Sequence, residues 1–190
     1  MTRDRCAVIV SVLLLAGCLC LSATAHAEPS LPFYRLVDTA AQRLGTADPV
    51  AASKWITGGP ITDRQRADQV LHAVAADASA RGIDPQYVRA VFADQIAATE
   101  GIEYTRLAQW KFDSTIAPTA APDLADSRTQ IDEYNRTLVE EIALQWDSLR
   151  GRDCGQNLSE AVAAVAKARK LDGLYRQALI SATRSYCCPV

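Results

Sequence analysis

The apolar positions of this chain recur three and four residues apart, which is the period of an amphipathic α-helix rather than of a β-strand. Alanine is abundant, glycine is sparse, and no run of strand length alternates strictly between apolar and polar residues. The pattern predicts an all-α, single-domain bundle of about six helices, two of them long and central. The predicted helical segments are 31–45, 48–57, 63–81, 84–113, 124–150, 155–170 and 172–186, with 84–113 and 124–150 as the long ones.

Start and stop signals bound several of these segments. Asp48 followed by Pro49 predicts an N-cap and a first helical position, because the missing N–H of proline costs nothing in the first turn. Asp84 and Pro85 give the same signal for the first long helix. The helix before it is expected to stop at Gly82, since glycine readily adopts the left-handed backbone that ends helices.

Charged and hydrogen-bonding side chains interrupt the apolar faces of the helices predicted in the first two-thirds of the chain. A charge on a core-facing position is costly unless a partner or a ligand compensates it. The apolar stripe of the first long helix continues as Gln95, Thr99 and Glu103, and Asn135 lies on the stripe of the second. The interrupting cations are Arg43, Lys54, Arg66 and Arg128. Together these positions predict a polar pocket among the first four helices.

Each interrupting residue also has a simpler interpretation when it is taken alone. Arg43 or Arg128 could lie at a helix edge with its charged end in water. Thr99 and Glu103 could form a hydrogen-bonded pair one turn apart. Asp63 could serve only as an N-cap. The cluster is what favours a pocket over these separate explanations.

The first 27 residues are predicted to be a secretory signal peptide, with a short charged start and an apolar run over residues 6–21. The small residues before position 28 form an A-x-A cleavage site that ends at Ala27. A competing interpretation is a lipoprotein signal, which would anchor the chain to a membrane through Cys18. The sequence favours cleavage after Ala27, which leaves residues 28–190 as one secreted or periplasmic domain.

The composition beyond residue 27 excludes several function classes. Without Arg3, Asp4 and Arg5, 18 basic and 21 acidic groups remain, with no basic run, which argues against nucleic acid as a partner. The remaining histidine, His72, is predicted to be exposed, so a histidine-based triad or metal site is not expected. No phosphate-binding glycine loop occurs. The chemistry left is a cationic pocket for an anionic substrate, without metal or cofactor.

Three cysteines follow the signal segment, at positions 154, 187 and 188. Export favours a disulfide. A bond between Cys154 and Cys187 would close a loop of about 34 residues and stabilise the fold by about 3–4 kcal/mol in the chain-entropy treatment. Cys188 could replace Cys187, pair with another chain, or stay free, and the sequence leaves these alternatives open.

A series of short stretches, in order and with specific spacing, resembles the secreted subclass of the all-helical chorismate mutases. The resemblance spans about residues 34–187 and implies a fold like that of type II chorismate mutases. The matching stretches include Leu36-Val37-Asp38, Arg43-Leu44, Asp48-Pro49-Val50-Ala51, Lys54-Trp55, Asp63, Arg66, Ile83-Asp84-Pro85, Asp94-Gln95-Ile96, Ala98-Thr99-Glu100, Ile102-Glu103-Tyr104, Ser127-Arg128, Cys154 and Ser185-Tyr186-Cys187.

The resemblance assigns roles to the residues that interrupt the apolar faces. It implies that four cations bind the two carboxylates and the ether oxygen of chorismate, with Lys54 at the ether oxygen. These cations are Arg43, Lys54, Arg66 and Arg128. It further implies that Thr99 contacts a carboxylate, that the backbone of Asp63 contacts the substrate hydroxyl, and that Glu103 lies against the ether oxygen. The implied catalytic residues are Lys54, Arg66, Glu103 and Arg128.

The implied activity is the Claisen rearrangement of chorismate to prephenate, without covalent intermediate or cofactor, in a homodimer whose pockets each lie within one subunit. One departure concerns the substrate hydroxyl, near which relatives place a glutamine or glutamate, whereas this chain has Ala67 and Val70. That departure supports an alternative function, a non-catalytic envelope protein that binds an aromatic or dicarboxylate metabolite. A third interpretation is a structural dimer whose interrupting residues are only surface charges.

Overall fold

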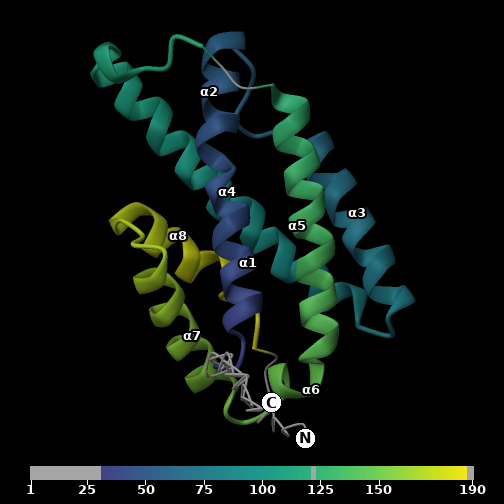
Figure 1. Cartoon of the computed structure of the whole chain (residues 1–190). Coiled ribbons are helices and arrows are strands. Elements are labelled where there is room, and N and C mark those ends of the chain that lie inside the picture. The colour runs from purple at the N-terminus through teal and green to yellow at the C-terminus, as the bar shows by residue number, and fades with distance from the viewer. Residues whose placement is uncertain (1–30, 121–122, 188–190) are drawn as a thin grey trace, which may run out of the picture.

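In the computed structural model, which describes residues 31–120 and 123–187, all regular secondary structure is helical (Figure 1), as the sequence pattern predicts. No helix in these ranges is both long and apolar enough to cross a bilayer. The predicted signal peptide, with Cys18, and the third cysteine, Cys188, lie outside them. The helices are α1 (Tyr34–Gly45), α2 (Ala47–Thr57), α3 (Arg64–Ala80), α4 (Pro85–Phe112), the 3₁₀ turn η1 (Ser114–Ile116), α5 (Leu124–Leu144), α6 (Trp146–Leu149), α7 (Cys154–Ala168) and α8 (Gly173–Ala182).

α1 and α2 follow each other almost without interruption through the middle of the molecule (Figure 1). Thr46, between them, keeps a helical backbone, and its hydroxyl donates to the carbonyl oxygen of Arg43 at 2.7 Å. Pro49 lacks the N–H that would continue the hydrogen-bond ladder to Gly45. The prediction that Asp48 caps a separate helix is wrong, because α2 begins one residue earlier and this carboxylate instead pairs with Arg106, 2.7 Å away on α4.

The other predicted start and stop signals are confirmed. Asp63 caps α3 by accepting a hydrogen bond from the backbone N–H of Arg66 at 3.0 Å. Asp84 caps α4, with proline at the first helical position. Gly82 has φ of 73°, in the left-handed region, and follows Arg81, the C-cap of α3. These caps fix where α3 and α4 begin, and therefore which of their side chains face α2 and α5.

The helices pack around one main core. α3 lies against α4 and α5, while α7 and α8 cover the other side of α1, and α8 also packs on α4 (Figure 1). The largest fully buried apolar side chains include Leu36, Phe92, Leu138, Ile142 and Tyr186. Buried polar residues interrupt the inner faces of α1, α2, α4 and α5, among them Arg43, Ser53, Gln95, Thr99, Glu103 and Asn135.

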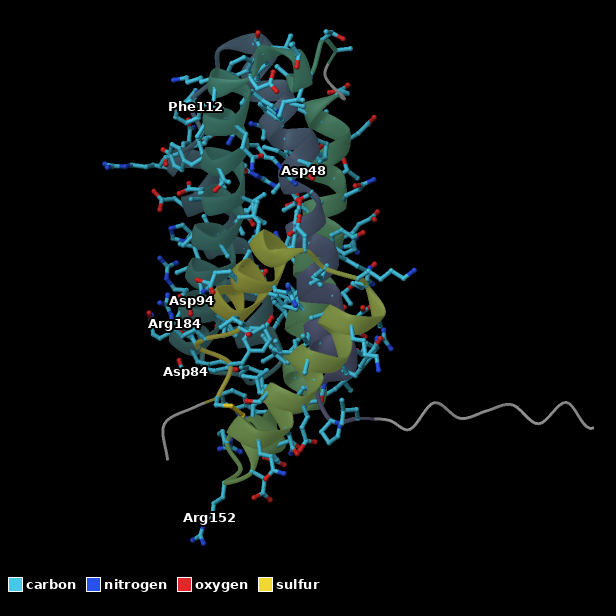
Figure 2. All side chains as sticks on the ribbon, turned by 90° about the vertical axis from the view of Figure 1, so that its left-hand side faces the viewer. Asp48, Asp84, Asp94, Phe112, Arg152 and Arg184 are labelled. Carbon is cyan, nitrogen blue, oxygen red and sulfur yellow. A yellow bond between two sulfur atoms is a disulfide. The ribbon has the colours of Figure 1, made fainter. Side chains whose placement is uncertain are left out.

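The C-terminal segment is tied back to this framework. Arg184 and Ser185 both bond to the carboxylate of Asp94 on α4, at 2.5 and 2.6 Å, and Figure 2 shows Asp94 and Arg184 next to each other. Cys154 and Cys187 form a disulfide, as predicted. The contacts hold the end of the chain against α4, where the side chain of the neighbouring Gln95 also donates to the hydroxyl of Tyr186.

Candidate active site

A pocket open to solvent lies among α1, α2, α3, α4 and α5, with an empty space of about 610 Å³ that includes its mouth. All seven residues predicted from the sequence line it, so helices far apart in the chain bring them together. They are Arg43, Lys54, Asp63, Arg66, Thr99, Glu103 and Arg128. The prediction placed the pocket among the first four helices but also counted Arg128, which lies on α5, so α5 forms a further wall.

Arg43 lies at the inner end of the pocket, with only 4% of its surface exposed. Its Nε donates to Oδ1 of Asn135 at 2.8 Å, and its Nη1 donates to the hydroxyl of Thr99 at 3.2 Å and the carbonyl oxygen of Gln95 at 3.4 Å. Burial is the main reason why its pKa falls to about 10, a value at which the group stays charged near neutral pH. Since all of these partners are neutral, its positive charge remains available to an anion.

Lys54 and Glu103 form an ion pair across the pocket, with Nζ and Oε2 2.8 Å apart and both side chains largely buried. Nζ also donates to the carbonyl oxygen of Ile61 at 2.6 Å, in the loop that precedes α3. Burial raises the pKa of the Glu103 carboxyl, and the nearby Glu100 raises it further, although Lys54 acts in the opposite direction. A carboxyl with a raised pKa can hold a proton and donate it in a hydrogen bond.

Two arginines stand nearer to the solvent. Nη2 of Arg66, on α3, lies 2.6 Å from Oδ1 of Asp132 on α5, while Nη2 of Arg128, on α5, lies 3.7 Å from Oδ2 of Asp63. The arginine side chains are 27% and 46% exposed, respectively, so the pocket changes from a buried inner end to a partly hydrated mouth. Both can reorient toward a ligand more easily than Arg43 can.

An apolar wall faces these charges. Ala67 and Val70, at the positions where the resemblance implies a departure from relatives, both line the pocket from α3. Val70 is buried and belongs to the main core. Ile96 on α4 and Ile131 on α5 line the same cavity. A ligand here would therefore meet cations around an apolar surface, which suits a small molecule with carboxylates on a carbon framework.

Three groups hold the predicted residues in place without having a role that the sequence indicates. Asn135 was visible as a polar residue on an apolar stripe, and the structure shows that it positions Arg43. Asp132 and the carbonyl oxygen of Ile61 gave no local signal, because they act on side chains 66 and 7 residues away. Within the described ranges, no group of three or more His, Cys, Asp or Glu residues is placed to hold a metal ion. His72 is exposed, as predicted.

Comparisons with known proteins relate this chain to one family. A sequence model of the family described as chorismate mutase type II matches residues 34–104. The secreted chorismate mutase of Mycolicibacterium smegmatis is 54% identical over 163 residues, which cover 86% of this chain and 90% of that protein. The secreted chorismate mutase of Mycobacterium tuberculosis is 44% identical over 163 residues, 86% of this chain and 82% of that protein. The crystal structure of chorismate mutase from Burkholderia thailandensis has a TM-score of 0.77 at 35% identity, and the match covers 82% of this chain and 98% of that one.

Proposed function

The chain belongs to the type II family of chorismate mutases, and we propose that the pocket between α1 and α5 is the active site in which this secreted enzyme converts chorismate to prephenate. One observation carries the proposal for the site. The seven residues to which the sequence resemblance assigns substrate contacts come from five helices and one loop, yet they all line a single cavity.

The reaction breaks the ether C–O bond of chorismate while a new C–C bond forms within the same molecule. It requires no nucleophile and no proton relay, so the protein has two tasks. The first is to hold the folded, chair-like conformer of the substrate, in which the reacting carbons approach each other. The second is to stabilise the negative charge that builds on the ether oxygen as the C–O bond breaks. The apolar wall with Val70 and the buried Arg43 serve the first task.

Lys54 is well suited to the second task. An ammonium group has three N–H donors, and two of them point to the carbonyl oxygen of Ile61 and to Glu103. These two bonds fix the ammonium and leave one donor for the ether oxygen. Because Lys54 is already held, little reorganisation is needed when charge develops in the transition state.

The charges that line the pocket fit a dianion once Glu103 is protonated. The lining includes four cations, Arg43, Lys54, Arg66 and Arg128, against the carboxyl groups of Asp63, Glu100 and Glu103. With Glu103 neutral, the net charge of this set is about +2, opposite to the two carboxylates of chorismate. A protonated Glu103 could also donate a hydrogen bond to the ether oxygen, which an ionised one would repel.

Activity is therefore expected to fall as the pH rises through the raised pKa of Glu103, because the carboxyl is protonated below that pKa and ionised above it. In Glu103→Gln the amide cannot ionise, and this decline should disappear. The measurement is kcat/KM for chorismate from about pH 5 to 9 at constant ionic strength. A wild-type profile as flat as that of a folded Glu103→Gln variant would contradict the protonated role.

The direct test of the active site follows the loss of chorismate's ultraviolet absorbance with purified residues 28–190. Replacing Arg128 with alanine removes a cation at the mouth of the pocket and is expected to lower kcat/KM by about 100-fold. The matched control is Arg152→Ala, which removes an exposed arginine at the lower end of the molecule in Figure 2. Equal activity of the two variants would show that the reaction takes place elsewhere.

Cleavage after Ala27, a single domain over residues 28–190 and a homodimer remain predictions from the sequence and the resemblance. The intact mass of the exported protein distinguishes cleavage there from lipid attachment at Cys18. Sedimentation velocity of the purified domain gives its oligomeric state.

A further inference from the structure

Two ion pairs of opposite polarity join the start of α3 to α5 beside the pocket. α3 and its cap supply a carboxylate and then a cation, Asp63 and Arg66, whereas α5 supplies a cation and then a carboxylate, Arg128 and Asp132. The first pair, Asp63 with Arg128, consists of two residues that line the pocket. The second pair is different, because Asp132 lies outside the pocket and binds Arg66 from the side that faces away from it.

The position of Arg66 explains why a group behind it matters. Its side chain lines the pocket and also a separate groove between α3 and α5, and Asp132 lines only that groove. Arg66 therefore forms part of the partition between the two spaces. Asp132 takes one donor of the guanidinium at 2.6 Å, and a guanidinium has five donors in a fixed plane. Holding Nη2 on the groove side sets the plane in which the remaining donors meet a ligand on the pocket side.

Asp132 also offsets a repulsion within the pocket. Burial contributes most to the lowered pKa of Arg43, but the charge of Arg66 lowers it as well, while that of Asp132 raises it. The carboxylate thus compensates part of the repulsion between two guanidinium groups that must both approach one small dianion. Its own side chain is 54% exposed, so water screens its repulsion of the substrate carboxylates.

We propose that Asp132 is a positioning residue, which aims the guanidinium of Arg66 at a carboxylate of the substrate by holding Nη2 across the α3–α5 groove. The proposal rests on the active site proposed above. It distinguishes Asp132 from the acidic residues that line the pocket, since Asp132 lies outside the pocket, accepts a hydrogen bond from Arg66 and touches no reacting atom. It also means that the position of α3 relative to α5 affects how the substrate is oriented in the pocket.

A double-mutant cycle with Arg66 tests this directly. Asp132→Ala is expected to lower kcat/KM for chorismate by about 10-fold, because a misaligned arginine loses part of its contact in the transition state. Asp132→Asn keeps an oxygen at the acceptor position and should retain activity within about threefold of wild type. In the Arg66→Ala background, Asp132→Ala should have no further effect. Glu133→Gln, an exposed neighbour on α5, controls for the loss of one negative charge and should match wild type.

The outcomes separate this proposal from the one on which it rests. If Arg66→Ala keeps wild-type activity, the proposed active site fails. If Arg66→Ala is impaired but Asp132→Ala is not, the site stands and the positioning role is overturned. The role is also overturned if the loss in Asp132→Ala persists in the Arg66→Ala background, or if Asp132→Asn is as impaired as Asp132→Ala. Thermal unfolding of each variant shows whether a loss of activity is caused by a loss of fold. If Asp132 were purely structural, Asp132→Ala would lower the melting temperature, and Asp132→Asn would not restore the activity.

Discussion

Replacing Lys54 with alanine is expected to lower kcat for the rearrangement of chorismate by about 10²- to 10³-fold, which is the usual loss when one preorganised donor to a developing oxyanion is removed. The ammonium is held by Glu103 and by the carbonyl oxygen of Ile61 before any substrate binds. None of the three arginines that line the pocket bonds to both Glu103 and the carbonyl oxygen of Ile61. A neighbouring arginine is therefore not held at the position of the Lys54 ammonium. The measurement is kcat at saturating chorismate, with the fold verified by thermal unfolding.

The control for the Lys54 variant is Lys111→Ala, which removes an exposed lysine from the last turn of α4 and should leave kcat unchanged. Lys54→Ala also leaves Glu103 buried without its ion-pair partner, a state in which the carboxyl is expected to take up a proton. The double variant Lys54→Ala, Glu103→Gln removes that complication. A kcat within about threefold of wild type in this folded double variant would contradict the role of the ammonium.

Removing the disulfide is expected to have the largest effect on stability. Cys154 begins α7 and Cys187 follows the buried Tyr186, and the bond closes a loop of about 34 residues. The double variant Cys154→Ser, Cys187→Ser should lose about 3–4 kcal/mol of unfolding free energy, since the unfolded chain regains the entropy of that loop. Because each kcal/mol shifts the Tm of a domain of this size by about 2–4 °C, the melting temperature should fall visibly.

Denaturant unfolding measures this loss. Cys188→Ser should be present in both the disulfide-bonded reference and the variant, so that no alternative bond forms. The slope of free energy against denaturant should stay similar if the change is confined to the lost cross-link. A difference of less than about 1 kcal/mol would mean that Tyr186 and the bonds of Asp94 already hold the C-terminal segment without the disulfide.

The helices and the pocket cations could be predicted because their signals are local. A buried arginine such as Arg43 interrupts an apolar stripe within its own helix, and a cap such as Asp63 precedes the helix that it caps. Helical periodicity therefore indicates both that a polar residue faces inward and where its helix starts. The same reasoning identified Thr99. The simpler interpretation paired Thr99 with Glu103, but its hydroxyl accepts a hydrogen bond from Arg43 instead.

Pairings between helices could not be predicted in this way. Asp48 looks like a cap in its local sequence, but it binds Arg106, 58 residues further on, because α2 packs on α4. Asp132 looks like an ordinary surface acid, and its contact with Arg66 exists only because α3 lies on α5. Such contacts depend on which helices pack against each other. The packing of the whole core determines these neighbours, so the sequence pattern of a single helix does not indicate them.

The near-continuity of α1 and α2 limits the insertions and deletions that the chain can tolerate between Arg43 and Lys54. Arg43 and Lys54 are 11 residues apart, and 11 residues at about 100° each make close to three whole rotations and a rise of about 16 Å. Because α1 and α2 form a nearly continuous helix, the two cations project from it in nearly the same direction. The spacing constrains this part of the chain: side chains between the two can change, but adding or deleting one residue would turn one cation by about 100° away from the pocket that both line.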